Sequence, residues 1–252
     1  MNSIINPLRY YRRGKAFFHN PSFVKALELT KAEGEKSGSR TAVINFLLST
    51  LSGNPRYLEI GVRDPKDNFD QVQCADKLSV DPGYELKENQ ASFKMTSDQF
   101  FDGLRNKSIG NPDQKWDLIF IDGLHLAEQV DRDISNSLDF LNDHGFLVIH
   151  DCNPPTEWHA RECFSFPHSP AQAAWNGTTW KGFLKYRQVN HLYSCCVDTD
   201  WGVGIISKSK KIGDSLAPVN PFYEFSEFDR NRKNWMNLLS FEEFKSLVGE
   251  KN

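Results

Sequence analysis

The sequence predicts an α/β fold, a three-layer sandwich with helices on both faces of a mostly parallel β-sheet. Short apolar runs that end in glycine or an acid alternate with amphipathic helices. One strand–helix–strand unit spans about 35 residues, a length typical of a parallel crossover. A chain of 252 residues can bury a full core. We therefore expect one domain with its core at about 41–207, an N-terminal helical extension at 1–40 and a C-terminal extension at 208–252.

The first half of the core alternates helix and strand. Apolar residues recur every three or four positions over 41–51, which predicts a helix, and a Ser-Gly-Asn-Pro sequence ends it. Apolar runs at 57–61 and 78–81 predict two buried strands. The run 91–95 is a weaker candidate for a third strand. It leads into residues 96–98, a Thr-Ser-Asp sequence typical of a helix N-cap.

The second half contains the strongest pattern. Residues 116–123 form an apolar run with acids near its ends, which predicts the fourth strand. Over 126–141 the apolar residues fall on one helical face and the charged residues on the other. Residues 142–145 are expected to close that helix. The run 145–150 predicts the fifth strand, which completes the crossover.

The remaining third of the chain is less regular. The proline-rich stretch after Asp151 is long enough to predict a lid or binding loop. We expect a helix at 178–187, then two late strands at 191–197 and 201–207. The tail is aromatic and ends in a predicted helix at 241–248. Its aromatic residues are assigned to the core or to a subunit contact: Phe222, Tyr223, Phe225, Phe228 and Trp235.

Charge and hydropathy limit the partners. The net charge of -3 argues against general nucleic-acid binding and favours a small molecule or sugar. The sequence shows no signal peptide and no transmembrane run, so the cytoplasm is the default location, and a homo-oligomer is compatible with the sequence. A basic and aromatic cluster at 9–18 predicts either a solvated first helix or contact with an anionic membrane or a partner.

The five cysteines are an odd, scattered set, which predicts reduced thiols rather than a disulfide framework. A zinc site can be drawn from four of the residues that follow the fifth strand. Their spacing fits no common structural zinc pattern, so this interpretation is disfavoured. The residues concerned are His150, Cys152, His159 and Cys163.

Acidic residues and a glycine end the predicted strands. These are Glu59 with Gly61, then Asp81, Asp122 and Asp151. In an open parallel sheet, ligands bind beyond the carboxyl ends of the strands. One such acid could merely cap the next helix, but four acids converging on one edge repel each other unless a ligand or cation lies among them. The sequence therefore predicts a site at this edge.

Each strand end has an expected role toward a nucleoside-containing cofactor. Gly61 lets the backbone approach a ligand closely, and Asp81 is placed to accept hydrogen bonds from ribose hydroxyls. Ser97 and Asp98 offer polar groups to an adenine, although helix capping explains them equally well. The expected cofactor-binding residues are Glu59, Gly61, Asp81, Ser97, Asp98 and Asp122.

These motifs resemble the class I S-adenosylmethionine-dependent methyltransferases, which have a Rossmann-like fold. The resemblance is carried by 57–61 (Tyr-Leu-Glu-Ile-Gly) and 80–82 (Val-Asp-Pro). It is most specific at 120–125 (Phe-Ile-Asp-Gly-Leu-His) and 145–151 (Gly-Phe-Leu-Val-Ile-His-Asp). The last pair is similar to the branch that holds macrocin-type sugar O-methyltransferases and cephalosporin-hydroxylase-like proteins. It extends over about 41–207.

The resemblance implies an enzyme that uses S-adenosylmethionine to methylate a hydroxyl of a sugar, glycan precursor or glycosylated metabolite. It implies that Asp122 and Asp151 hold Mg²⁺ or Mn²⁺ and that His125 is the general base, with Asp122 beside it. A helix N-terminus next to His125 would favour its neutral form. Aromatic residues of the long loop and the following helix are assigned to the acceptor side: Trp158, His159, Trp175 and Trp180.

Two departures from the family pattern keep alternatives open. Val62-Arg63-Asp64-Pro65 replaces the usual further glycines, and Cys152 follows Asp151 where metal-dependent relatives often have a second acid or an amide. Cysteine is a poor ligand for magnesium, so a third protein ligand is not identified. The main alternative is an inactive cofactor-binding or scaffold protein of the same fold in a polysaccharide pathway. A nicotinamide-dependent dehydrogenase is disfavoured because no GxGxxG follows the first strand.

Overall fold

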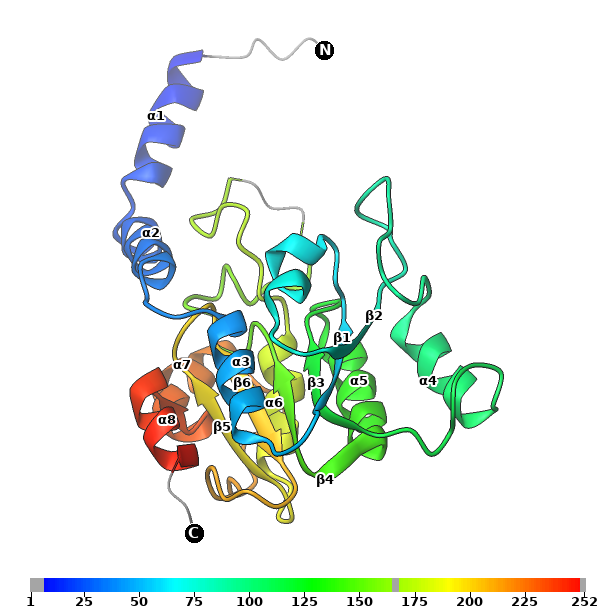
Figure 1. Cartoon of the computed structure of the whole chain (residues 1–252). Helices are drawn as coiled ribbons and strands as arrows, with labels where there is room; N and C mark the ends of the chain where they lie inside the picture. The colour runs from blue at the N-terminus through cyan, green and yellow to red at the C-terminus, as the bar shows by residue number, and fades with distance from the viewer. Residues whose placement is uncertain (1–6, 165–167, 250–252) are drawn as a thin grey trace.

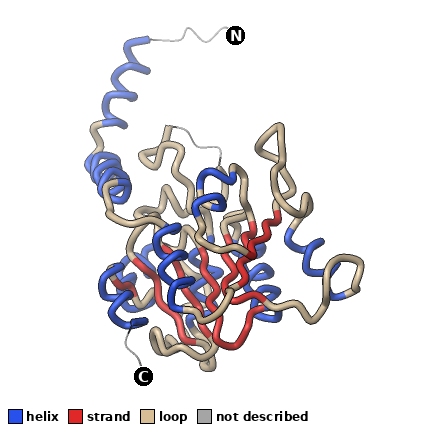
Figure 2. The backbone as a smooth tube through the Cα atoms, in the orientation of Figure 1, coloured by secondary structure: helices blue, strands red, loops and turns tan. Residues whose placement is uncertain are grey.

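A computed structural model describes residues 7–164 and 168–249 as layers of helices around one seven-stranded sheet (Figures 1 and 2). The strand order is β2-β1-β3-β4-β6-β5-β7. The strands are β1 (Arg56–Ile60), β2 (Asp76–Val80), β3 (Trp116–Ile121), β4 (Leu141–Ile149), β5 (Tyr193–Val197), β6 (Val203–Ser207) and β7 (Leu238–Leu239). Strands β1 to β4 are mutually parallel, and β6 is antiparallel to both β4 and β5. This confirms the predicted α/β sandwich with a late antiparallel strand.

Eight α-helices and two short 3-10 helices are present in the described part of the chain. The α-helices are α1 (Pro7–Phe18), α2 (Pro21–Gly34), α3 (Arg40–Thr50), α4 (Ser97–Arg105), α5 (Ala127–Phe140), α6 (Thr179–Arg187), α7 (Phe225–Trp235) and α8 (Phe241–Gly249). The 3-10 helices are η1 (Pro65–Asp67) and η2 (Phe69–Gln71). No helix in these ranges is both long and apolar enough to cross a membrane.

Two hydrophobic clusters make the sheet the middle layer. On one face, Leu58 and Ile119 of the sheet pack with residues of α4, α5, α6 and α7. On the other face, Tyr57 and Phe120 pack with residues of α3 and α8. Alternate residues of β1 and β3 thus enter opposite clusters, which explains why these strands are apolar throughout rather than alternating. The short strands fix the carboxyl ends of β1, β3 and β4 next to one another.

Two predicted boundaries are wrong. Residues 91–95 do not form a strand, because Phe93 makes only an isolated bridge to Val80 at the edge of the sheet. Residues 142–145 do not form a turn between helix and strand: α5 passes directly into β4 at Leu141, which pairs with Trp116. Gly145 permits this course, since a Cβ there would lie 2.7 Å from the Asp117 carbonyl oxygen.

The C-terminal extension contributes to the core. Phe228 of α7 is fully buried and its ring lies 4.5 Å from that of Trp180. Phe244 of α8 is fully buried on the opposite face of the sheet. The assignment of the tail aromatics to the core therefore holds for Phe228 and Trp235, whereas Phe222 is 80% exposed.

Candidate active site at the carboxyl edge of the sheet

Three predicted site residues meet beyond β3 and β4. Asp122 follows β3, Asp151 follows β4, and His125 lies between Asp122 and the start of α5. The His125 Nε2 atom is 3.4 Å from Asp122 Oδ1, and its Nδ1 atom is 3.2 Å from Asp151 Oδ2. One ligand atom from each residue lies within 4.8 Å of the other two. We call Asp122, His125 and Asp151 the strand-end cluster.

Backbone geometry fixes the two carboxylates. The Asp122 N–H donates to the Ile60 carbonyl (2.8 Å), which ties the end of β3 to β1. Gly61 has φ +85°, and a Cβ there would lie 2.3 Å from the Asp122 carbonyl oxygen. The missing side chain of Gly61 thus makes room for the backbone of Asp122. Asp151 has φ +60°, a left-handed conformation that is costly for most residues and tolerated by aspartate.

The His125 ring is held by the loop that follows β4. Its Nδ1 atom lies 2.8 Å from the Trp175 carbonyl oxygen, and its ring stacks on the Trp175 indole with centroids 5.1 Å apart. The Thr178 N–H donates to the His125 carbonyl (2.8 Å). A neutral ring that donates its Nδ1 proton to Trp175 presents the Nε2 lone pair toward Asp122. This is the orientation that a general base or a metal ligand requires.

Three neighbours of this cluster have no settled role in the sequence reasoning. It gives none to Arg40 and Asp200, and it names His150 as a residue that could compete with His125 for the catalytic role. Buried His150 has Nδ1 3.1 Å from Asp122 Oδ1 and Nε2 3.3 Å from Asp200 Oδ1. The Arg40 Nε atom is 3.7 Å from Asp122 Oδ2, and its Nη1 atom is 3.6 Å from Asp200 Oδ1. A signal existed for Asp200, because the turn between the two late strands returns to the carboxyl edge. Arg40 begins the helix that precedes β1, and only tertiary packing reveals its role.

The charges of the site shift its pKa values. Burial acts to raise the pKa of Asp122, but the charge of His150 and hydrogen bonds from both histidines hold it well below its usual range. Burial acts to lower the pKa of His125, but Asp151 and Asp122 outweigh it and raise that pKa to about 9. The pKa of His150 is raised well above its ordinary value by Asp122 and Asp151, despite burial. The two carboxylates therefore outweigh the helix N-terminus that was expected to keep His125 neutral.

The predicted cofactor residues on β1 and β2 bind their own loops. Glu59 accepts hydrogen bonds from the Tyr57 hydroxyl (2.5 Å) and the Asn68 amide (2.9 Å), and burial raises its pKa to about 7. The Asp81 carboxylate accepts the backbone N–H groups of Arg63 (3.0 Å) and Gly83 (2.6 Å). Glu59 and Asp81 thus fix the loops that follow their strands, and the half-buried Asp81 carboxylate retains further acceptor lone pairs.

Ser97 and Asp98 face α5. The Ser97 hydroxyl donates to Asp133 (2.6 Å), and Asp98 pairs with Arg132 (3.2 Å). The N-cap of α4 is Thr96, which forms a capping box with Gln99, so neither Ser97 nor Asp98 is the cap residue. Within residues 7–164 and 168–249, no recorded hydrogen bond joins Ser97 or Asp98 to the strand-end cluster.

Of the aromatic residues assigned to the acceptor side, Trp175 touches the cluster through its stack on His125. Trp180 is 1% exposed and packs on Phe228, so it belongs to the core. His159 is fully buried, and its Nδ1 atom lies 2.9 Å from the Thr156 hydroxyl. The disfavoured zinc set is not assembled, since among the described residues the group able to hold a cation is the strand-end cluster.

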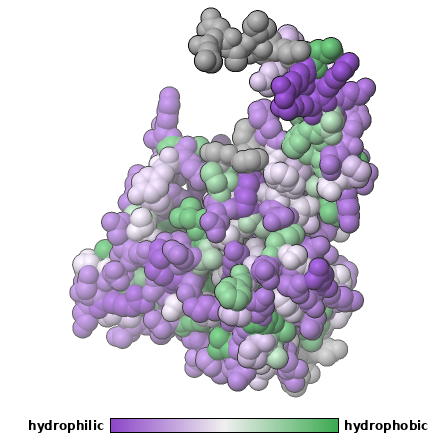
Figure 3. Space-filling view, turned by 180° about the vertical axis from the view of Figure 1, so that it is seen from behind, coloured by the Kyte–Doolittle hydropathy of each residue, from purple (hydrophilic) through white to green (hydrophobic). Residues whose placement is uncertain are grey.

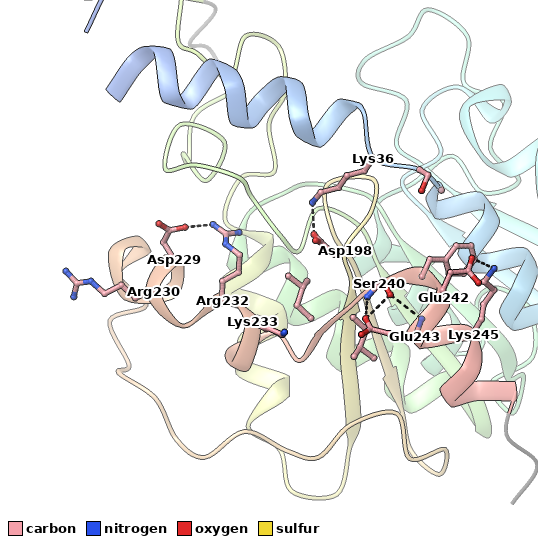
Figure 4. Close-up of a pocket in the computed structure, with 15 residues that line it drawn as sticks. Lys36, Asp198, Asp229, Arg230, Arg232, Lys233, Ser240, Glu242, Glu243 and Lys245 are labelled. Carbon is pink, nitrogen blue, oxygen red and sulfur yellow. Dashed lines mark hydrogen bonds and ion pairs between the residues drawn. The ribbon is translucent and has the colours of Figure 1, made fainter. Parts of the chain in front are cut away.

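A cavity of about 1000 Å³ lies between the segment after α2 and helices α7 and α8 (Figure 4). Most of its charged side chains pair with one another: Lys36 with Asp198 (2.6 Å), and Arg232 with Asp229 (2.8 Å). Asp198 also accepts a hydrogen bond from Asn153, two residues after Asp151. A residue that lines this cavity, Asp198, therefore helps to hold the turn that carries Asp151, but the strand-end cluster lies outside the cavity.

The comparison with protein families agrees with this geometry. Residues 42–152, which include β1 to β4 and the whole strand-end cluster, match the model of a family described as a methyltransferase domain. This stretch is similar to a methyltransferase domain. The match confirms the resemblance to class I S-adenosylmethionine-dependent methyltransferases and, with it, the expectation of an enzyme of that type. No curated protein sequence matches the chain.

Solved structures show a loose likeness to the domain. An S-adenosylhomocysteine-bound methyltransferase, PaMTH1 of Podospora anserina, is 16% identical over 83% of this chain and 100% of its own, with a TM-score of 0.43. MycE methyltransferase of the mycinamycin pathway, solved with Mg, S-adenosylhomocysteine and mycinamycin VI, is 15% identical over 82% of this chain and 59% of its own (TM-score 0.41). An O-methyltransferase from Bacillus cereus with S-adenosylhomocysteine is 13% identical over 77% and 94% (TM-score 0.40).

Proposed function

We propose that this protein is an S-adenosylmethionine-dependent O-methyltransferase whose acceptor is a hydroxyl of a sugar, a glycan precursor or a glycosylated metabolite. The observation that carries the proposal is the strand-end cluster inside the methyltransferase domain, where a histidine contacts two carboxylates. The same three residue types at this edge suit removal of a proton from a hydroxyl. We propose that the chain is a single methyltransferase-like domain with its core at about 41–207.

S-adenosylmethionine is the methyl donor of the class that the chain resembles. We assign its ribose to Asp81, because this carboxylate ends the strand next to β1 and two backbone N–H groups hold it in place. Glu59 and Gly61 shape the loop on which the methionine part would lie, through Asn68 and through the close approach of Asp122. Ser97 and Asp98 stay as the assigned polar neighbours of the adenine.

The strand-end cluster fits a divalent cation. Asp122 and Asp151 offer carboxylate oxygens that lie close enough together to share one ion, which leaves the Nε2 lone pair of His125 to act as the base. Carboxylate oxygens select hard cations such as Mg²⁺ and Mn²⁺. A bound divalent cation supplies positive charge that offsets the two carboxylates and lowers the pKa of a hydroxyl next to it.

The residues of the chain perform the proton transfer. Once the charges of Asp151 and Asp122 are offset, the pKa of His125 falls back toward its ordinary value. The neutral ring then takes the proton of the acceptor hydroxyl at Nε2 as the oxygen attacks the methyl carbon of the donor. The oxygen–carbon bond forms while the sulfur–carbon bond breaks, and S-adenosylhomocysteine leaves. The Trp175 carbonyl accepts the Nδ1 proton and fixes the ring, and Asp122, 3.4 Å from Nε2, stabilises the imidazolium that forms once the proton is taken. Because displacement at a methyl carbon is in line, positioning supplies much of the rate enhancement.

The Trp175 indole supports a ring-shaped acceptor beside His125. One part of the indole stacks on His125, and the side chain as a whole is only half-buried. Aromatic faces pack well on the C–H faces of sugar rings. Trp158 stays assigned to this side, since it lies on the same loop as Trp175 and lines a cavity of about 500 Å³ with Arg161.

Methyl-labelled donor tests the proposal. The full chain is incubated with labelled S-adenosylmethionine, Mn²⁺ and a panel of nucleotide sugars, simple glycosides, glycosylated metabolites and catechols, and label in each product is measured. We expect label on the oxygen of one sugar hydroxyl and a large decrease after chelation. Binding of S-adenosylhomocysteine by calorimetry without transfer to any member would favour the inactive scaffold. Transfer to nitrogen or carbon would overturn the proposed reaction.

A further inference from the structure

Helix α1 carries aromatic and basic side chains on opposite sides. With 3.6 residues per turn, four aromatic residues fall within an arc of about 120°, and four basic residues fill an arc of about 160° across the axis. The aromatic residues are Tyr10, Tyr11, Phe17 and Phe18, and the basic residues are Arg9, Arg12, Arg13 and Lys15. The helix contains no acidic residue. This is the pattern of a helix that lies in a membrane interface.

The aromatic side of α1 is used by the rest of the fold only at its C-terminal end. No residue of α1 is buried, and Tyr10 and Tyr11 are 61% and 67% exposed. The helix contacts α2 at its C-terminal end, where the rings of Phe17 and Phe18 lie 5.0 and 5.3 Å from that of Phe23. Figure 3 shows this segment projecting at the top of the molecule, with hydrophilic and hydrophobic residues side by side.

Helix α2 fastens this projection to the carboxyl edge of the sheet. The Thr30 hydroxyl donates to the Pro170 carbonyl (3.0 Å) in the loop after β4. Glu33 accepts the backbone N–H of Trp201 (3.0 Å) in the turn after β5. Both contacts lie on connections that leave the carboxyl ends of parallel strands. Helix α1 therefore extends from the same side of the molecule as the strand-end cluster (Figure 1).

Other large apolar side chains are exposed on the same side. The loop after β2 exposes Tyr84 (84%) and Leu86 (42%). Leu124 is exposed in the connection after β3, and Phe164 in the loop after β4. Monomeric proteins expose single apolar residues anywhere, but a concentration on one side marks an interaction surface. The exposed apolar side chains of the carboxyl edge and those of α1 therefore lie on the same side of the molecule.

We propose that α1 binds the surface of an anionic phospholipid bilayer and that the carboxyl edge of the sheet then faces the lipid. Charge favours this partner: the whole chain has a net charge of -3, whereas α1 carries four basic residues and no acid. Anionic headgroups attract such a segment, and the aromatic rings enter the boundary between headgroups and acyl chains. A helix of 12 residues lies along the interface, since it is too short to span it. The inference does not depend on the proposed reaction.

Vesicle flotation tests the binding. The full chain is mixed with phosphatidylcholine vesicles that contain about one-third phosphatidylglycerol, or none, and floated on a density gradient. We expect about tenfold more bound protein with the anionic vesicles, and a decrease as salt rises. Arg12→Glu with Arg13→Glu should abolish binding, and Tyr10→Ser with Tyr11→Ser should weaken it about tenfold.

A matched charge reversal controls for net charge. Lys107→Glu with Lys211→Glu changes the net charge by the same amount as the Arg12 and Arg13 reversals. These two lysines are exposed after α4 and β6, at the opposite end of the sheet. This variant should float like the parent protein. All variants should keep the parent's melting temperature, because none of these side chains is buried. Equal loss in the control would reduce the effect to overall charge and overturn the proposal.

Hydrogen exchange tests the orientation on the native chain. With anionic vesicles, we expect slower exchange over α1 and over 82–90, and unchanged exchange in the turn at 208–213. Protection of α1 alone would overturn the proposed orientation. A concentration-dependent dimer that Tyr10→Ser with Tyr11→Ser disrupts, with no vesicle binding, would assign the aromatic side to a second copy of the chain. Binding to heparin or DNA as strong as binding to vesicles would show nonspecific attraction of polyanions.

Discussion

The carboxyl edge of the sheet has two halves that treat their acids differently. At the ends of β1 and β2, Glu59 and Asp81 accept hydrogen bonds from neutral donors of their own loops. At the ends of β3 and β4, Asp122 and Asp151 instead face the rings of His125 and His150. The first half is therefore already satisfied by the fold. In the second half, the carboxylates are balanced in part by Arg40 and otherwise by protons on the two histidines or by a ligand.

The difference teaches where substitutions should act. Hydrogen bonds from neutral donors hold Glu59 and Asp81 in place whether or not a ligand is bound. These residues are therefore expected to set the shape of their loops and the affinity for the cofactor. The buried carboxylates and histidines at the ends of β3 and β4 change their protonation when a ligand or cation binds. These residues are therefore expected to determine the rate of the reaction. Variants of the second half should change turnover and ion binding most. Variants of the first half should have smaller effects, on affinity and on stability against pH.

Removing the His125 ring should have the largest effect. His125→Ala should lower turnover by about 100-fold to 10⁴-fold on the acceptor found with labelled donor, because the proton acceptor is lost. Affinity for S-adenosylhomocysteine, measured by calorimetry, should change by less than about threefold. His144→Ala removes an exposed histidine of β4 and should leave turnover unchanged. Parent-like turnover in His125→Ala would remove this residue from the mechanism.

Replacing one carboxylate of the strand-end cluster should weaken ion binding by about 30-fold or more. Asp151→Asn is the sharper variant, since asparagine tolerates the φ of +60° at this position. Manganese affinity is measured by electron paramagnetic resonance with thermal unfolding as a check on the fold. Asp143→Asn, on the same strand with its side chain 89% exposed, is the matched control. Equal Mn²⁺ affinity in the parent and Asp151→Asn would exclude Asp151 as a ligand.

On the other half of the edge, Asp81→Ala should weaken S-adenosylhomocysteine binding by about tenfold while Mn²⁺ affinity stays the same. Asp64→Ala is its control, because Asp64 also accepts a backbone N–H in the loop after β1, from Lys66 (3.1 Å). If both variants lose affinity equally, loop order explains the result. If Asp81→Ala binds like the parent, the ribose assignment is wrong.

Replacement of Glu59 should have the smallest effect on turnover and ion binding. Its effect should be visible as a change in the pH dependence of the free energy of unfolding. Burial raises the pKa of Glu59 from 4.5 to about 7, so the folded protein holds this proton more tightly than the unfolded chain. The free energy of unfolding therefore falls as pH rises from about 4.5 to about 7, by about 3 kcal/mol. In Glu59→Gln this decline should disappear in urea unfolding measured across that range. The decline from Asp133, whose pKa is raised to about 6 mainly by burial, should persist in the variant.

The sequence predicted most of the sheet because each strand is a short apolar run bounded by glycine or acids. It predicted the meeting of Asp122, His125 and Asp151 because parallel strands that are neighbours must end together. It missed Arg40 and the role of Asp200, since both reach the cluster through packing of segments that are far apart in the sequence. It gave no sign that Gly61 also makes room for the backbone of Asp122, at the end of another strand. Local patterns do not carry such information.

The anchoring of the loop after β4 has a consequence for engineering. At its start, the Asn153 N–H donates to the Trp201 carbonyl, and at its end the Thr178 N–H donates to the His125 carbonyl. Gly177, with φ +58°, lies so close to His125 that a Cβ would be 2.0 Å from the His125 carbonyl oxygen. Exposed positions of this loop, such as Glu162 and Cys163, can therefore be varied while both anchors, Trp175 and Gly177 are retained. Such variants would test whether this loop influences the choice of acceptor while the strand-end cluster stays in place.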